Sequence, residues 1–541
     1  MRKTYTISIF LISIILLSLI GTKISDNLFA TDKNKNKAKN EEKLNEIIKY
    51  ISSFYVENVD WDDTMQGAIE GMLSKLDPHS VYIPVLEAKL NEENFEGKYQ
   101  GIGIQFDVID GYLTVIAPIP GSPSDELGLM SGDKIIKING ESAINITNNE
   151  VQSKLKGEKG TTVDITIIRE GIDKELEFTI TRDDIPIFTV NTYFINEDKS
   201  GYIFLSRFAK TTEQEIENAI SELEQQGMQR LILDLRWNAG GYLDQAVRVA
   251  AKFVGGHKKI VYTKGRLSHF DEEYFADTFG NEKVRDIPLI VLINHASASA
   301  SEIVAGAIQD YDRGLIVGTT SFGKGLVQRE FPLQDESRLR LTISKYYTPS
   351  GRLIQRNYKG KRIEDYYADG LDSADVIISE DSLNNRPVYF TAAGRKVFGG
   401  GGITPDIQVE YEGNSKSLDL ARQFFQKRIF FETASRFSKE NKYWKKDFDK
   451  FLNEFTVDEI LLNMFKEIAH TKGLEIEEKM FDNDITYIKL RLKAEIARSL
   501  WDNNKYYQTL LIEDNQYKKA LTLFSVAEKI LTNENSQVVN N

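Results

Sequence analysis

The 541-residue chain contains no cysteine and only five histidines. The absence of cysteine excludes a thiol nucleophile, a disulfide framework and a cysteine-ligated zinc site. The histidines form no HExxH motif and no pair at metal-binding spacing, so we expect no metal site. The formal net charge of −13 lacks the basic excess of nucleic-acid-binding proteins, and we expect no nucleic-acid partner.

What the chain does contain is ordinary for a soluble globular protein. Hydrophobic residues make up 41% and charged residues 28% of it, which is ample for a buried core. The length alone predicts about three or four domains.

The first residues have the pattern of an export signal. Arg2 and Lys3 precede an apolar run over residues 5–20. We assign residues 1–30 to a signal peptide or a retained membrane anchor, because the run is slightly short for a spanning helix and no clean A-x-A cleavage site follows. A buried N-terminal helix is the third alternative. Either of the first two places the bulk of the chain in the periplasm or cell envelope.

The pattern of predicted secondary structure changes at several points along the rest of the chain. Short β-like runs alternate with glycine turns in one segment, strands alternate with helical stretches in the next, and the last segment is charged and helical with a polar tail. The predicted divisions are a polar linker over 31–43, a helical region over 44–96, a small β module over 97–184, a largely parallel α/β core over 185–412 and a helical extension over 413–541.

The β module carries a glycine-containing loop suited to an anion. In "YQGIGIQF", Gly101 and Gly103 free the backbone to turn its N–H groups towards one point, and Ile102 and Ile104 lead into a strand edge. A peptide C-terminal carboxylate is one candidate ligand. Together with "GLMSGDKIIKINGE" some 30 residues later, the segment resembles a PDZ domain. The alternative is a β module that packs against the rest of the protein and binds no ligand.

The candidate chemistry lies in "LIVLINHASASASEIVAGAIQD", which reads as a buried strand, a loop of small residues and a helix. A serine at such a junction faces helix N–H groups that stabilise an oxyanion. His295 is close in sequence to Ser299, but we assign it no role. Lys324 in "SFGKG" follows an apolar strand, and burial there would lower its pKa enough for a base. On residues alone, an ordinary loop and a solvated lysine remain open.

The surrounding stretches resemble the C-terminal processing peptidases, or tail-specific proteases, of the S41 serine peptidase family. They occur in the family's order and span residues 76–407. The matching stretches are "LDPHSVYI", the PDZ-like module, "LILDLRWNAGG", "SASASEIVAGAIQD", "GTTSFGKGLVQ", "KYYTPSGRLIQ" and "GGGGITPDI". The resemblance implies a multidomain α+β protein with an N-terminal helical segment, a PDZ domain, an α/β core of the S41 and ClpP–crotonase kind, and a C-terminal helical extension.

The resemblance also implies a Ser–Lys dyad. It makes Ser299 the nucleophile and Lys324, 25 positions later, the general base, with Gln328 supporting the lysine. Ser297 and Ser301 are the alternative nucleophiles, and are otherwise loop residues that form hydrogen bonds.

The oxyanion donors implied are the backbone N–H of Ala300 and that of Gly240 or Gly241. Arg236 and Asn238 are expected to brace this loop rather than to touch substrate.

The expected activity is cleavage of polypeptides with apolar C-termini through an acyl-enzyme, without a cofactor. Asp310 is expected to be mainly structural, and Lys156 stands where relatives carry a regulatory arginine. The extension could form a homodimer, bind an adaptor or regulator protein, or pack on the core. The rival hypotheses are a non-catalytic PDZ or ligand-binding scaffold of the same fold and a Ser–His hydrolase.

Overall fold

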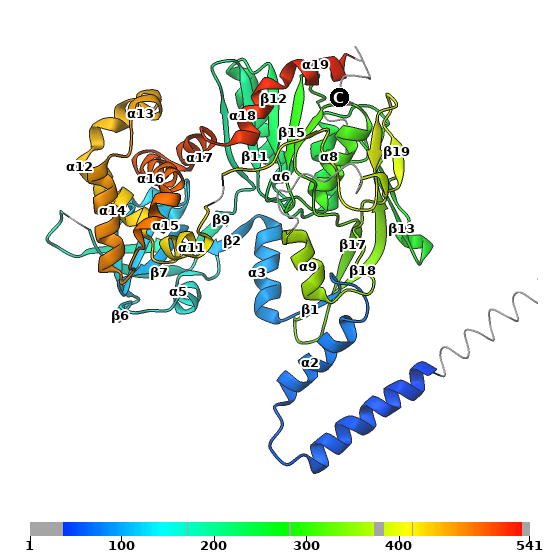
Figure 1. The fold of residues 1–541 in the computed structure, drawn as a ribbon. Helices are drawn as coiled ribbons and strands as arrows, with labels where there is room; N and C mark the ends of the chain where they lie inside the picture. The colour runs from blue at the N-terminus through cyan, green and yellow to red at the C-terminus, as the bar shows by residue number, and fades with distance from the viewer. Residues whose placement is uncertain (1–35, 170, 281–282, 373–382, 414, 533–541) are drawn as a thin grey trace, which may run out of the picture. The chain divides into compact units, whose positions relative to one another are not determined.

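The computed structural model describes residues 36–169, 171–280, 283–372, 383–413 and 415–532 (Figure 1). The predicted signal peptide or anchor lies outside these ranges. Within them, no helix combines the length and the apolar character needed to cross a bilayer. The chain divides into two compact units, residues 1–75 and 76–541.

The first unit is helical over residues 36–54 and in α2 (Trp61–Leu73). Asp60 caps α2 by accepting hydrogen bonds from the N–H groups of Asp62 and Asp63. The predicted polar linker over 31–43 overlaps the start of the helix over residues 36–54, at residues 36–43. Its lysine, alanine and glutamate residues favour a helix, and Lys37 and Glu41 form an i,i+4 ion pair.

The second unit begins with α3 and a β module. One five-stranded antiparallel path, β3-β4-β5-β7-β8, carries β6 on β5 and buries its own apolar core. A separate two-stranded ladder of β2 and β9 joins the module to the rest of the unit. The elements are α3 (Val85–Glu96), β2 (Lys98–Gly101), β3 (Ile104–Ile109), β4 (Tyr112–Pro118), α4 (Pro123–Glu126), β5 (Lys134–Ile138), β6 (Glu141–Ser142), α5 (Asn148–Leu155), β7 (Thr162–Ile168), β8 (Leu176–Thr181) and β9 (Asp183–Pro186).

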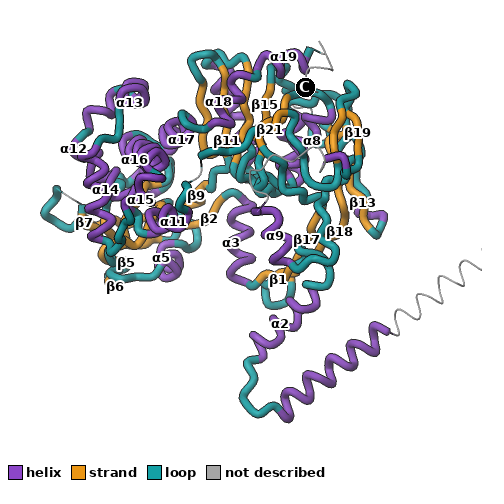
Figure 2. The backbone as a smooth tube through the Cα atoms, in the orientation of Figure 1, coloured by secondary structure: helices purple, strands orange, loops and turns teal. Residues whose placement is uncertain are grey.

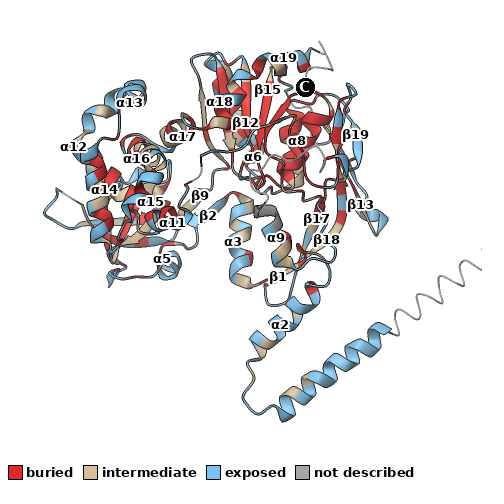
Figure 3. Ribbon diagram, viewed as in Figure 1, coloured by how far each residue is buried: buried red, intermediate tan, exposed pale blue. Residues whose placement is uncertain are grey.

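The central sheet has the order β10-β11-β12-β15-β16-β21, and all its pairs after β10–β11 are parallel. Figure 2 shows strands of this sheet in orange, among them β11, β15 and β21. Helices α6, α7 and α8 cover one face, and every residue of α8 is buried (Figure 3). The elements are β10 (Val190–Ile195), β11 (Ser200–Leu205), α6 (Thr212–Gln225), β12 (Arg230–Asp234), α7 (Leu243–Ala251), β15 (Leu289–Ile293), α8 (Ala300–Asp310), β16 (Leu315–Gly318) and β21 (Ile407–Gln408). Strand–helix alternation produces this parallel sheet, as predicted.

The other face of the central sheet is covered by the last two helices that the structure describes. Side chains of α18 (Asn515–Thr522) and α19 (Phe524–Leu531) pack on Ile232, Ile290 and Leu292 in one apolar cluster. Both faces of these strands are therefore buried, which explains the apolar runs Leu231–Leu233 and Leu289–Ile293 within them. Of the three roles left open for the extension, packing on the core applies to this part.

A second sheet has the order β1-β18-β13-β14, with β17 paired to β18. A short hairpin of β19 and β20 lies nearer the C-terminus. These elements are β1 (Val81–Ile83), β13 (Lys259–Gly265), η1 (Ser268–Phe270), β14 (Glu273–Phe275), β17 (Leu326–Pro332), β18 (Arg338–Tyr347), α9 (Ile363–Asp372), β19 (Val388–Phe390) and β20 (Lys396–Phe398).

The first part of the extension forms a helical bundle with a core of its own, rich in phenylalanine. Arg428 at its α11–α12 corner pairs with Asp107 of β3. The helices are α11 (Leu418–Gln426), α12 (Ile429–Glu440), η2 (Lys442–Lys446), α13 (Phe448–Glu454), α14 (Glu459–Thr471), α15 (Glu478–Asn483), α16 (Ile485–Leu500) and α17 (Asn503–Leu511).

Candidate active site

Ser299 stands at the N-cap of α8, directly after the loop that follows β15. Its backbone has φ 54° and ψ −111°, a region that non-glycine residues rarely adopt. Neighbouring Ser297 and Ser301 are fully buried, and their hydroxyls donate to the carbonyls of Leu235 and Asn238 (2.8 Å each). Of the three candidate serines, only Ser299 keeps part of its surface accessible.

One buried carboxylate, Glu302, joins the two candidate catalytic segments. Its Oε2 accepts hydrogen bonds from the backbone N–H of Ser299 (2.8 Å) and of Lys324 (2.9 Å). Its Oε1 accepts from the Ser321 hydroxyl (2.5 Å) and the Gly323 N–H (2.7 Å). The strand–helix junction and the glycine turn therefore meet on a single side chain. Sequence reasoning missed Glu302, although Ser299–Glu302 is an S-x-x-E capping pattern.

Lys324 lies in the turn between β16 and β17. The pKa of its amine is lowered from 10.5 to about 8: burial is the largest cause, the Arg340 cation adds to it, and the Glu302 and Asp77 carboxylates act in the opposite direction. Among the hydrogen bonds of the described residues, none joins the Lys324 amine to the Ser299 hydroxyl. The lysine can nevertheless be neutral near physiological pH, as a general base must be.

This pKa predicts the pH dependence of activity. A lysine base works only when it is neutral, so kcat/KM should rise about tenfold per pH unit below pH 8 and level off above it. His79, whose pKa burial lowers to about 3, would add no limb between pH 5 and 9. Initial rates on a fluorogenic peptide over pH 5–10 would measure the midpoint. A midpoint near 6.5 would identify a histidine base, and one near 10.5 a solvated lysine.

Gln328 lies on β17, and among the hydrogen bonds of the described residues none joins it to the Lys324 amine. Its amide donates to the Thr342 hydroxyl (3.3 Å), which in turn donates to Asp77 Oδ1 (2.9 Å). The Ser80 hydroxyl donates to the other oxygen of Asp77 (2.6 Å). Gln328 thus belongs to a polar network that holds Asp77, and this carboxylate acts on the lysine through its charge.

An aromatic cluster surrounds His79 beside this network. His79 lies within hydrogen-bond distance of the Tyr366 and Tyr367 hydroxyls (3.3 and 3.2 Å), and its ring meets that of Phe322 edge-on. The Lys324 cation contributes to lowering the His79 pKa. Sequence reasoning found no partner for this histidine, because its tyrosines lie almost 290 positions away.

The glycine loop after β12 packs against the serine. A Cβ at Gly240 would lie 2.8 Å from the Ser299 Cβ. The Gly240 N–H donates to Asn238 Oδ1 (2.9 Å), so it is already used within the loop. Gly241, at φ 147°, and Ala300, the first residue of α8, remain as the candidate oxyanion donors.

Arg236 and Asn238, the two residues predicted to hold the glycine loop after β12 in place, both form contacts in the interior. Asn238 accepts hydrogen bonds at its carbonyl from the Ala298 N–H (3.0 Å) and the Ser301 hydroxyl (2.8 Å). Arg236 pairs with Asp234 in the interior (2.6 Å). Asp310 pairs with buried Arg352, consistent with a structural role.

Of the loop Gly101–Ile104, the residues Ile102, Gly103 and Ile104 line a groove with a volume of ≈ 880 Å³. Gly103 has φ 80°, and a Cβ there would lie 2.2 Å from the Ser122 Cβ, so the close approach requires glycine. The walls combine β3, α5, the start of β10 and the start of α17; among them are Phe106, Gln152, Leu155, Tyr193, Arg207 and Asn503. A groove between a strand edge and a helix suits an extended peptide.

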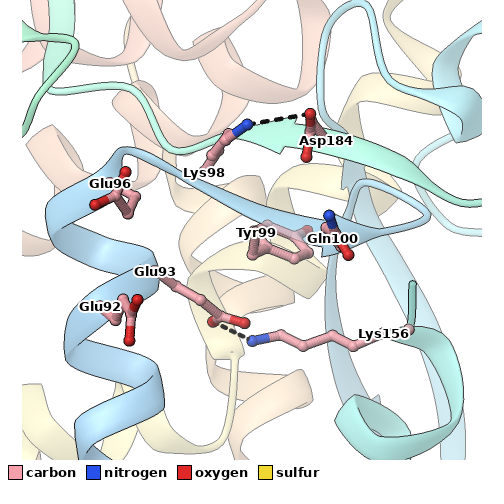
Figure 4. A pocket seen from close by; sticks show the side chains of 9 residues that line it. Glu92, Glu93, Glu96, Lys98, Tyr99, Gln100, Lys156 and Asp184 are labelled. Carbon is pink, nitrogen blue, oxygen red and sulfur yellow. Dashed lines mark hydrogen bonds and ion pairs between the residues drawn. The ribbon is translucent and has the colours of Figure 1, made fainter. Parts of the chain in front are cut away.

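Lys156 stands beside this groove, at the C-cap of α5. Its amine pairs with Glu93 of α3 (2.5 Å) and lies 5.0 Å from the centre of the Tyr99 ring (Figure 4). The same residues line a smaller cavity of ≈ 390 Å³, whose lining also includes the ion pair of Lys98 and Asp184 on the paired strands β2 and β9. Lys156 thus links the β module to α3.

No group of three or more metal-ligating side chains occurs in the described ranges. The candidate site is instead lined by the Ser299 hydroxyl, the Lys324 amine and backbone N–H groups. These are the components of a serine peptidase.

Comparison with known families agrees with this assignment. Residues 199–364 match the model of peptidase family S41, residues 100–180 a PDZ domain, residues 19–85 the activating protease CtpB N-terminal domain and residues 420–502 a family of unknown function.

Two relatives illustrate the likeness. Carboxy-terminal processing protease CtpB of Bacillus subtilis is 32% identical over 466 residues, which cover 84% of this chain and 88% of the relative. A carboxy-terminal-processing protease of Bartonella bacilliformis is 39% identical over 329 residues, covering 60% and 75%. The chain therefore belongs to peptidase family S41, as a carboxy-terminal processing serine protease with a PDZ domain. The predicted family and fold class are confirmed.

Solved structures include similar proteins. The photosystem II D1 C-terminal processing protease is 26% identical, with 68% of this chain and 86% of that chain covered and a TM-score of 0.34. The PDZ domain of the carboxy-terminal protease from Vibrio cholerae, solved in complex with peptide, is 30% identical; 16% of this chain and 97% of that chain are covered, with a TM-score of 0.16.

Proposed function

We propose that the protein is an endopeptidase with a Ser299–Lys324 dyad. The observation that carries the proposal is the Glu302 carboxylate, which holds the backbone of both residues on one oxygen beside a buried lysine of lowered pKa.

The proposed reaction has two steps. The neutral Lys324 amine takes the Ser299 proton as Oγ attacks the scissile carbonyl, and the N–H groups of Gly241 and Ala300 stabilise the oxyanion. The amine of the downstream product takes that proton and leaves an acyl-enzyme. Water, activated by the same lysine, then hydrolyses the ester, releases the carboxylic acid and restores the serine.

We further propose that the groove at Gly101–Ile104 selects substrates by their C-termini. Backbone N–H groups of the loop would bind the terminal carboxylate, and Phe106 and Leu155 favour apolar side chains. The peptide complex of the Vibrio cholerae PDZ domain supports this mode. Arg2, Lys3 and the following apolar run support exported polypeptides as substrates, in the periplasm or cell envelope.

The test is cleavage of one unstructured protein that carries either an apolar or a doubly acidic C-terminal tail. The full chain should cleave the apolar-tailed form at least tenfold faster, a difference of about 1.4 kcal/mol. Ser299→Ala should abolish cleavage yet bind the apolar tail with the parent's affinity.

Two results would count against the proposal. Equal cleavage of both tails would refute selection by the groove. Tail binding without any cleavage by the parent would refute the peptidase and leave the PDZ scaffold.

A further inference from the structure

A buried network of charges connects the end of β12 with the C-terminal helices. Arg236, which is 5% exposed, donates to Asp234 through Nε (3.0 Å) and Nη2 (2.6 Å). On its other side, Nη1 lies 2.9 Å from Gln516 Oε1 and 2.8 Å from Asp514 Oδ2. Tyr202 donates to Asp234 (2.7 Å). One guanidinium is therefore held between two carboxylates from segments about 280 residues apart.

The second half of this network is fixed in place by α18. Asp514 is the N-cap of the helix, and its Oδ1 accepts from the Tyr517 N–H (2.9 Å). Gln516 is fully buried and donates to the Val409 carbonyl (2.7 Å). Since α18 packs on the central sheet, neither side chain can follow Arg236 if the arginine moves.

Arg236 leads directly into the oxyanion loop. Trp237, at φ 64°, donates its N–H to Asn294 Oδ1 (2.9 Å), and Asn238 bonds the turn that contains Ser299. Gly240, two residues further on, lies against Ser299. A buried arginine that loses one of its carboxylates keeps a positive charge that is only partly balanced. Its side chain, and with it the strained turn at Trp237, can then adopt other conformations.

We propose that Asp514 and Gln516 are positioning residues for catalysis: by holding Arg236, the C-terminal helix keeps the Trp237–Gly241 loop in the shape that binds the oxyanion. The inference rests on the proposed function. It gives α18 a part in the chemical step, in addition to its cover of the sheet.

The main variant is Asp514→Asn, which keeps the size and the N-cap acceptor but removes the charge opposite Arg236. We expect kcat to fall roughly ten- to a hundredfold with KM and tail affinity unchanged, because an oxyanion contact acts in the transition state. Gln516→Leu should act in the same direction. The matched control is Tyr517→Phe on the same helix, which loses only its hydrogen bond to Asn196 Oδ1 and should leave kcat unchanged.

A double-mutant cycle tests the route through Arg236. In an Arg236→Met background, Asp514→Asn should have little further effect on kcat. Additive effects of the two substitutions, or an equal loss in Tyr517→Phe, would overturn the proposal.

A readout that does not need activity separates this inference from the proposed function. The chain has four tryptophans, and with 5-fluorotryptophan the ¹⁹F signal of Trp237 is assigned by Trp237→Phe. Asp514→Asn should shift or broaden that signal, and Tyr517→Phe should not. An unmoved signal overturns the inference, whereas a parent that cleaves no substrate overturns only the peptidase.

Discussion

Replacing Lys324 with methionine is expected to lower kcat for peptide cleavage by about 10³- to 10⁴-fold, the upper range for removal of a general base. Methionine matches the length and suits the buried environment, so the turn and its hydrogen bonds to Glu302 should persist. Only the proton acceptor for Ser299 is lost. Steady-state kinetics on the apolar-tailed substrate would measure kcat, and thermal unfolding would confirm the fold.

A second substitution at the same position separates the base from the charge. Lys324→Arg keeps a cation that cannot lose its proton at neutral pH, and should be as inactive as the methionine variant. Cleavage that survives Lys324→Met would contradict the dyad and direct attention to His79, the titratable ring beside it.

Replacing Glu302 with glutamine is expected to reduce both stability and activity. The carboxylate accepts four hydrogen bonds, and an amide presents its NH₂ group to two of those donors. Leaving buried donors unpaired should lower the free energy of unfolding by roughly 3 kcal/mol. At about 2–4 °C per kcal/mol for a domain of this size, the Tm should fall by roughly 6–12 °C.

The activity of this variant should fall as well, because the backbone positions of Ser299 and Lys324 are no longer tied to one group. Differential scanning calorimetry and kcat on the same preparation provide the two measurements. Glu273→Gln, which removes an exposed ion pair with Lys259, is the control and should change neither appreciably. A Glu302→Gln protein with the parent's Tm and kcat would show that the shared carboxylate is dispensable.

The sequence predicted the segments of the site better than their connections. Ser299 and Lys324 were candidates because each lies at a strand end among small residues, and only the resemblance to the S41 family made them the predicted dyad. Asp77 and His79 were missed, because their partners lie some 260 to 290 positions away and no local pattern reports such contacts. Glu302 was the recoverable residue, since the S-x-x-E pattern is local.

The packing of the C-terminal helices on the central sheet could also be predicted in part from the sequence. The runs Leu231–Leu233 and Leu289–Ile293 place apolar side chains on both faces of the sheet, which requires a cover on each side. Helices α6–α8 can cover only one face, so the second cover had to come from outside residues 185–412. The pairing of Arg236 with Asp514 could not be inferred, because a buried ion pair leaves no periodic signal in sequence.

The backbone of Ser299 restricts which nucleophile this turn can carry. At φ 54° a side chain branched at Cβ is strongly disfavoured. Threonine therefore cannot replace Ser299, even though it has the same hydroxyl group. Cysteine is unbranched and fits. Since the chain has no cysteine of its own, a Ser299→Cys protein would carry a single thiol, and any thiol-directed label would report from one atom at the centre of the site.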